Sequence, residues 1–277
     1  MKSSGYAVFS LVACGIPAGA MAQEANEELR SGNEAIVVTA TRQPLLIERV
    51  PGSVLLLDET ALEQAEGATG AEDLAELLPG VEAAVANGTQ VAFQIRGIGA
   101  VDHQALTPTA AAVYADGVFQ ATNVQTSALL YDLERVEVLK GPQGALYGRN
   151  ASAGAVNLIS RRPDAEGANY ARFGYGNFDR FDLDAAFGGR IGEGAYARLA
   201  TTYVRRSPVL ENVAGPAEAG GETDEFGIRL SALLDRGGPS LLVRGHYEQD
   251  KGINTMPRNS SLELGAHQIE SAGDGVQ

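Results

Sequence analysis

An alternation of apolar and polar residues over residues 170–250 limits the fold of this chain more than any other feature. Five segments show it: residues 170–176, 181–187, 195–203, 226–232 and 241–247. Successive side chains of a β-strand point to opposite faces, so this period of two predicts strands with one apolar and one polar face. Arg198, Arg229 and Arg244 fall at polar positions of three of the segments. We therefore expect five antiparallel strands with charged residues on one face.

The connections between these segments differ in length. Those at 177–180, 188–194 and 235–239 are short, whereas 207–222 is long. Outer-membrane barrels have polar-in, apolar-out strands with short turns at one rim and longer loops at the other. A soluble β-sandwich, which also alternates, is the alternative. The charged inner positions and an export signal favour the barrel, and the lack of any run of 18 apolar residues excludes a helical membrane protein.

The export signal lies in residues 1–22. Lys2 provides a positive start, an apolar stretch follows, and Ala20-Met21-Ala22 has the small-residue pattern of a cleavage site. Acylation of Cys14 as in a lipoprotein is the alternative. Cys14 is the single cysteine, so the mature chain has neither a disulfide nor a thiolate metal site. We expect a signal peptide over 1–22 and a flexible acidic leader over 23–49.

Within the leader, residues 34–42 read EAIVVTATR, whose β-branched residues predict a short strand. Two interpretations remain open. The strand could pair with an exposed sheet edge of another protein, or it could be the first strand of the following domain.

Residues 50–163 have the pattern of a compact α+β domain. Strands are expected at 53–58, 93–97, 112–119, 135–141 and 154–160, with Asp116-Gly117 as a hairpin turn. Asp58 is expected to cap a helix that begins at Glu59. Thr69 and Glu72 have the spacing of a capping box for a second helix.

The segment 134–163 is rich in glycine, as a phosphate-binding loop would be. A P-loop requires Gly-Lys-Ser/Thr after the glycines, but here Lys140 precedes Gly141 and Pro142 removes a backbone donor. The glycines instead indicate a tight turn and close backbone packing. We find no catalytic or metal-ligand spacing and expect neither a cofactor nor enzyme activity. The formal net charge of −14 argues against a nucleic-acid partner.

These motifs together resemble the N-terminal part of TonB-dependent outer-membrane receptors. EAIVVTATR is similar to the TonB box; FQIRGIG, AAVYADGVF and LERVEVLKGPQGALYGRNASAGAVNLISRRP are similar to signature blocks of the plug. The resemblance implies an α+β plug followed by the first strands of an antiparallel transmembrane barrel, which would be incomplete over 164–277. It also implies a protein of the outer membrane, in contact with its lipid, that imports a ligand such as a ferric siderophore.

The resemblance also implies roles for particular residues. The TonB box, which TonB would bind by strand addition, comprises Glu34, Ala35, Ile36, Val37, Val38, Thr39 and Ala40. Plug residues with structural or gating roles would be Arg96, Gly97, Gly141, Gly144, Gly148 and Arg149. Of these, Arg96 and Arg149 would pair with carboxylates of the barrel wall; the alternative is that both are simply hydrated in a wet lumen. The alternative functions are a plug-only periplasmic module that binds TonB without transport and, third, a periplasmic nucleotide or hydrolytic enzyme.

Overall fold

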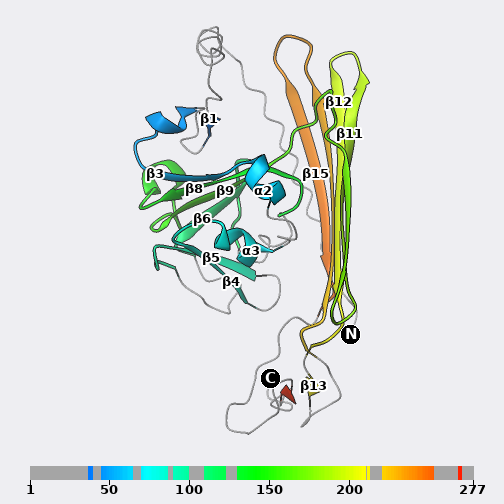
Figure 1. Ribbon diagram of the computed structural model, residues 1–277. Helices are drawn as coiled ribbons and strands as arrows, with labels where there is room; N and C mark the ends of the chain where they lie inside the picture. The colour runs from blue at the N-terminus through cyan, green and yellow to red at the C-terminus, as the bar shows by residue number, and fades with distance from the viewer. Residues whose placement is uncertain are drawn as a thin grey trace.

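The computed structural model describes residues 37–39, 45–64, 70–86, 90–99, 109–122, 130–209, 211–212, 220–252 and 268–269. The expected signal peptide and most of the leader, including Glu34, Ala35, Ile36 and Ala40, lie outside the described residues. The described chain forms an α+β N-terminal domain and, beside it, a sheet of long strands (Figure 1).

The N-terminal domain is built on a five-stranded sheet, the central sheet, whose strand order is β3-β8-β9-β6-β7. Its strands are β3 (Ser53–Leu57), β6 (Ala111–Ala115), β7 (Val118–Phe119), β8 (Leu133–Lys140) and β9 (Gly154–Ser160). The β6–β9 pair is parallel and the other pairs are antiparallel. The expected hairpin is confirmed, because Asp116 and Gly117, both at positive φ, join β6 to β7.

Each face of the central sheet has its own hydrophobic cluster. On one face, Val136 and Val138 of β8 pack with Leu74 and Leu78 from the α3 region. On the other face, Leu139 packs with residues that include Val38 and Tyr147. The first face is covered by α2 (Glu59–Gln64), α3 (Ala71–Glu76), β4 (Val81–Ala86) and β5 (Gln90–Ile95). The second face is covered by β1 (Val37–Val38), η1 (Ile47–Arg49) and α4 (Gly144–Tyr147), and β2 (Leu45–Leu46) pairs with β1.

The helix starts were predicted with mixed success. Asp58 caps α2 as expected, since its Oδ1 accepts a hydrogen bond from the Ala61 N–H at 2.8 Å. The expected capping box at Thr69 and Glu72 is wrong. The N-cap of α3 is Gly70, whose N–H donates to Asp73 Oδ2 at 3.0 Å. The cap therefore lies one residue later, and Asp73 takes the role of reaching back to the N-cap N–H that Glu72 was expected to have; Thr69 lies outside the described residues.

The second sheet, called the long sheet, contains the expected five antiparallel strands in the order β10-β11-β12-β14-β15. The strands are β10 (Tyr170–Gly176), β11 (Arg180–Gly192), β12 (Ala195–Arg206), β14 (Thr223–Leu234) and β15 (Leu241–Asp250). Four of them extend past the predicted segments, because backbone pairing continues where the alternation of side chains has ended. Two further short strands, β13 (Glu211–Asn212) and β16 (Gln268–Ile269), pair in parallel.

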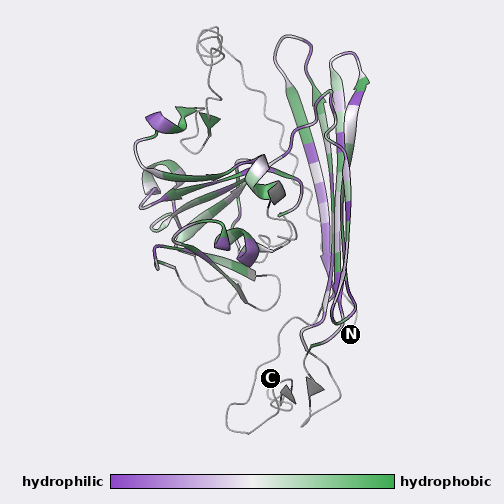
Figure 2. Cartoon of the chain, in the orientation of Figure 1, coloured by the Kyte–Doolittle hydropathy of each residue, from purple (hydrophilic) through white to green (hydrophobic). Residues whose placement is uncertain are grey.

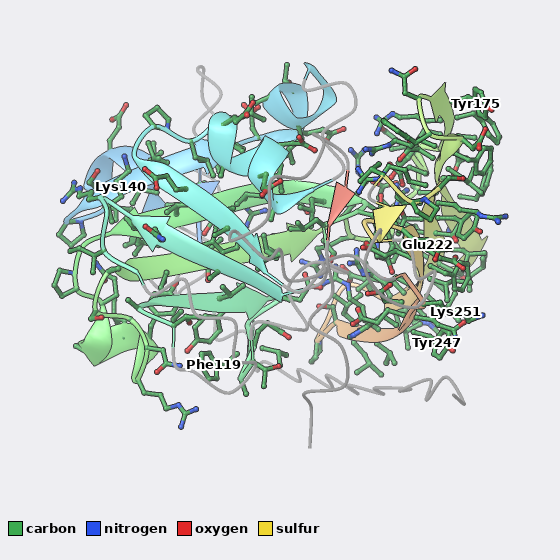
Figure 3. All side chains as sticks on the ribbon, turned by 90° about the horizontal axis from the view of Figure 1, so that it is seen from below. Phe119, Lys140, Tyr175, Glu222, Tyr247 and Lys251 are labelled. Atoms are coloured by element: carbon green, nitrogen blue, oxygen red, sulfur yellow. The ribbon has the colours of Figure 1, made fainter. Side chains whose placement is uncertain are left out.

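The two faces of the long sheet differ in polarity, and hydrophilic and hydrophobic bands alternate along its strands in Figure 2. The N-terminal domain lies against one face, called the inner face, and Tyr175 projects from the opposite, outer face (Figure 3). Large apolar side chains of the long sheet remain exposed, among them Phe173, Tyr175, Phe187 and Leu230. Within the described residues, no helix combines the length and apolar character needed to span a membrane.

Candidate functional site

The most specific contacts between the two parts come from three arginines of the inner face. Arg198 of β12 lies opposite Ser231 of β14, and Ser231 lies opposite Arg244 of β15. Arg229 is two residues before Ser231 and therefore on the same face. Neighbouring strands thus present three guanidinium groups to the N-terminal domain.

Arg198 forms a bidentate ion pair with Asp132. Its Nε donates to Oδ2 at 2.8 Å and its Nη2 to Oδ1 at 2.6 Å. Its Nη1 donates to the backbone oxygen of Gly167 at 2.5 Å. The two side chains are 3% and 2% exposed, so both charges are removed from water and depend on each other.

Arg229 binds the residue just before Asp132. Its Nη1 donates to the backbone oxygen of Tyr131 at 3.0 Å, and its guanidinium carbon lies 4.4 Å from the centre of the Tyr131 ring. That distance is within the range of a cation–π interaction. Burial raises the pKa of the Tyr131 phenol to about 12, so the ring is neutral at physiological pH. The ring also lies close to Gly227, where an added Cβ would be 3.1 Å from Tyr131 Cε1.

Arg244 binds the N-terminal domain at a separate place, where the β6–β7 turn meets the end of β9. Its Nη1 lies 2.5 Å from Asp116 Oδ1, and its Nη2 donates to the backbone oxygen of Ser160 at 3.0 Å. Asp116 also accepts a hydrogen bond from the Ser160 N–H at 2.9 Å. The turn between β6 and β7 and the end of β9 are therefore bound together at one arginine.

A small cavity lies between the domain and strands β10 and β11. Its volume is about 70 Å³, and its lining includes Glu59, Asp132, Arg161, Tyr170 and Asp184. A space of this size suits several water molecules, and its lining is rich in ionisable groups. The contact zone between domain and sheet is thus polar, as the lumen of an outer-membrane barrel is.

The N-terminal strand β1 lies on the second face of the central sheet. It pairs with β2, Val37 opposite Leu46 and Val38 opposite Leu45. The Val38 side chain is 0% exposed and packs in the cluster around Leu139 and Tyr147. The next residue, Thr39, is exposed, and its backbone N–H donates to Glu137 Oε1 at 3.0 Å. The described part of the expected strand at 34–42, residues 37–39, therefore packs against this chain's own central sheet.

The glycine-rich segment forms a compact turn around α4. The Gly141 N–H donates to the Ala153 oxygen at 2.9 Å, and Tyr147 receives a hydrogen bond from Asn157 Nδ2 at its hydroxyl. Gly141 and Gly148 have φ angles of 97° and 71°, which favour glycine. Gly144 has an ordinary φ and open space around it.

The structure places the two predicted plug arginines away from the long sheet's ionic contacts. Arg96 follows β5 in a turn, with φ of 55°, and its N–H donates to the Gly80 oxygen at 2.8 Å; Gly97 is its neighbour in that turn. Arg149 is exposed, and its guanidinium carbon lies 6.0 Å from the Phe119 ring centre. Among the described strands, no carboxylate forms an ion pair with Arg96 or Arg149, so their pairing stays a prediction.

The residues that bring domain and sheet together were not predicted as partners. The arginines of the inner face were recognised as polar-face residues, and Asp116 only as a turn residue. Asp132 and Glu137 carried no signal apart from being charged residues beside apolar runs. Among the described residues, no group of three or more His, Cys, Asp or Glu side chains is arranged to bind a metal ion.

Known proteins share both the sequence and the fold of this arrangement in part. Residues 47–155 match the TonB-dependent receptor plug domain family. The chain is 30% identical over 185 residues to the pesticin receptor of Yersinia pestis, which covers 65% of this chain and 26% of that protein. It is 28% identical over 223 residues to the catecholate siderophore receptor Fiu of Escherichia coli K12, covering 75% and 27%. The chain thus spans about a quarter of the length of these relatives.

Solved structures show the same fold over most of this chain. The ferric yersiniabactin uptake receptor FyuA of Yersinia pestis aligns with a TM-score of 0.64 at 24% identity, over 71% of this chain and 31% of that one. The Pseudomonas aeruginosa receptor FpvA, bound to a pyoverdine–iron complex, aligns with a TM-score of 0.66 at 20% identity, over 84% and 31%. Residues 47–155 therefore form a TonB-dependent receptor plug domain, and this domain and the long sheet together share their fold with part of these solved receptors.

Proposed function

We propose that this chain is the plug and first wall strands of an outer-membrane receptor that imports a scarce ligand with energy supplied through TonB. The observation that carries the proposal is the difference between the two faces of the long sheet. Its inner face binds the plug through Arg198, Arg229 and Arg244, whereas its outer face leaves large apolar side chains exposed. Such a sheet suits lipid on one side and a filled polar lumen on the other. In the plug-only alternative, a periplasmic module, this apolar face would be exposed to water.

We propose the following domain organisation: a signal peptide over 1–22, a leader with the TonB box over 23–49, the plug over 50–163 and barrel strands over 164–277. The short connections 193–194 and 235–240 lie at one end of the long sheet, and β1 lies toward the same end (Figure 1). Outer-membrane barrels keep their short turns on the periplasmic side. This position supports display of the TonB box to the periplasm, where TonB acts.

A charge placed on the lipid-facing side tests the membrane assignment. Leu230, 58% exposed, lies within β14 on the outer face, whereas Leu241 lies at the start of β15 on the same face. We expect Leu230→Arg to destabilise the inserted, folded chain in lipid vesicles by about 2–4 kcal/mol. Leu241→Arg should destabilise it by at most about 1 kcal/mol, because the cost of a charge depends on its depth in the bilayer. Urea titrations of the chain in vesicles measure both. Equal costs for the two variants would contradict a membrane-spanning β14.

A proline in the TonB box tests the partner. TonB is proposed to add a strand to the backbone of Ile36 to Thr39, so Val38→Pro removes one N–H donor and should weaken binding of the periplasmic domain of TonB roughly tenfold or more. Val38→Ala is the matched control, because it keeps the N–H and removes only buried methyl groups. We expect this control to bind TonB at least as well as the original chain. Unchanged binding by the proline variant would remove the TonB-box assignment.

The ligand class is proposed from the relatives. Fiu is described as a catecholate siderophore receptor and FyuA as a ferric yersiniabactin uptake receptor, whereas another relative, BtuB of Vibrio vulnificus, is described as a vitamin B12 transporter. We propose a ferric siderophore as the ligand. Uptake of radiolabelled iron complexes and of labelled cobalamin by cells that express the receptor, with and without TonB, distinguishes the two. TonB-dependent cobalamin uptake without iron uptake would overturn the assignment.

A further inference from the structure

We propose that Glu137 is a latch that holds Thr39 of the TonB box against the plug, and that β8 couples this latch to the arginine contacts on the long sheet. The proposal rests on the proposed function of residues 34–40 as the TonB box. Beyond that function, Glu137 is the residue that holds the box, and β8 is the element that controls it.

The latch is a buried carboxylate bound from two directions. Glu137 is 0% exposed. Its partner Thr39 lies 98 residues away in the sequence. The Thr39 N–H donates to Oε1 and Oε2 of Glu137 at 3.0 and 3.1 Å, and its hydroxyl lies 3.2 Å from Oε1. Arg135 Nε donates to Glu137 Oε1 at 2.7 Å, and Arg135 Nη2 lies 3.2 Å from the Thr39 hydroxyl. A buried carboxylate keeps such partners because losing them leaves its charge unsolvated.

The latch contact uses the Thr39 backbone N–H, which strand addition also requires. A peptide that adds to a sheet edge exchanges backbone N–H and C=O hydrogen bonds with its partner. While Glu137 binds the Thr39 N–H, that donor is not available to a strand of TonB, and the neighbouring Val38 side chain is buried. Release from Glu137 therefore has to precede or accompany full engagement of this part of the box.

Strand β8 joins the latch to the long sheet over a short distance in sequence. Tyr131 and Asp132, immediately before β8, are bound by Arg229 and Arg198. Glu137 follows five residues after Asp132. Between them, the pairing of β8 with β9 shifts register at Leu133 and Arg135, so Glu134 is an extra residue in the ladder. Such a bulge is a local irregularity at which the strand can change its twist without breaking the rest of the ladder.

The third arginine contact supplies a comparison within the same interface. Arg244 binds Asp116 and the Ser160 oxygen, which belong to the β6–β7 turn and to the end of β9. Among the described residues, its ion pair and hydrogen bonds go to Asp116, Ser160 and Arg161, none of which belongs to β8. If β8 is the coupling element, breaking the Arg198–Asp132 pair affects the latch, and breaking the Arg244–Asp116 pair does not.

Spin-label mobility at the TonB box tests the latch without TonB. The full chain, with Cys14→Ser, carries a nitroxide on Ala35→Cys and is studied in detergent micelles. We expect Glu137→Gln to raise the ratio of mobile to immobilised label roughly tenfold, because it weakens a charge-assisted contact made to a backbone N–H. Thr39→Val, which removes only the hydroxyl, should raise the ratio roughly two- to fivefold. An unchanged ratio in Glu137→Gln would overturn the latch.

The coupling is tested with Asp132→Asn and Asp116→Asn, which keep side-chain size and suit the positive φ of both positions. We expect Asp132→Asn to raise the mobile fraction several-fold and Asp116→Asn to leave it unchanged. Equal increases would indicate general loosening of the plug and overturn the role of β8. Binding of TonB to Val38→Pro reports on the TonB-box assignment separately: if that assignment failed, the mobility results would still decide whether Glu137 holds Thr39.

Discussion

Replacement of Arg198 by methionine is expected to weaken docking of the plug on the long sheet by about 3–5 kcal/mol. The substitution keeps most of the side chain's length but leaves the buried carboxylate of Asp132 without its bidentate partner. The backbone oxygens of Gly167 and Ala168 lose their donors as well. Urea-dependent proteolysis of the plug and hydrogen exchange of the β8 amides, with the chain in detergent, measure the loss.

Two matched variants identify the cause of that loss. In Arg198→Met with Asp132→Asn the unpaired charge is gone, so about half of the lost stability should return. Arg172 and Asp184 form a looser pair on the same sheet, at 3.5 Å with Arg172 56% exposed, and Arg172→Met should cost at most about 1 kcal/mol. A cost for Arg198→Met no larger than that of Arg172→Met would contradict the buried ion pair as the main anchor.

Replacement of Gly154 by alanine is expected to destabilise the plug by about 3 kcal/mol or more. Gly154 begins β9 with φ of 152°, and a Cβ there would lie 2.7 Å from Ile95 Cδ1 and in still closer contact with the Leu139 oxygen. The backbone oxygen belongs to β8, so relief of the clash would separate two paired strands of the central sheet. Denaturant unfolding followed by near-ultraviolet circular dichroism of the tyrosines measures the effect.

Gly144→Ala is the control for the same glycine-rich segment. Gly144 begins the short helix α4, has an ordinary φ and has no atom within 4 Å of an added Cβ. Alanine also favours a helix over glycine, so this variant should match or slightly exceed the original stability. If both alanine variants were equally tolerated, close packing at Gly154 would not explain the glycine.

The strands of the long sheet could be predicted because their pattern is local. Each side chain's face follows from its position in the strand, and the apolar positions Phe173, Tyr175, Phe187 and Leu230 are indeed exposed on the outer face. The Asp116-Gly117 turn and the Asp58 cap are local for the same reason. Strand β4 was missed because its sequence, VEAAVA, is rich in alanine, which has little preference for strands.

The site could not be predicted because its partners are distant in sequence. Arg198 and Asp132 are 66 residues apart, and Thr39 and Glu137 are 98 apart. Glu137 is a particular case: in RVEVL it alternates with valines and would be expected to face solvent, yet it is 0% exposed. A strand pattern shows which side of the sheet a residue takes, but it carries no information on what covers that side.

The sequence by itself determined the two kinds of sheet, the polarity of the long strands and the glycine-rich turn, since these follow from backbone geometry and side-chain alternation within short segments. Only the tertiary structure decided which charges meet. Arg198, Arg229 and Arg244 become one binding face because the register of three strands aligns them, and they bind Asp132, Tyr131 and Asp116 because the plug packs there. Buried charges require partners, and which partners are within reach depends on how the whole chain packs.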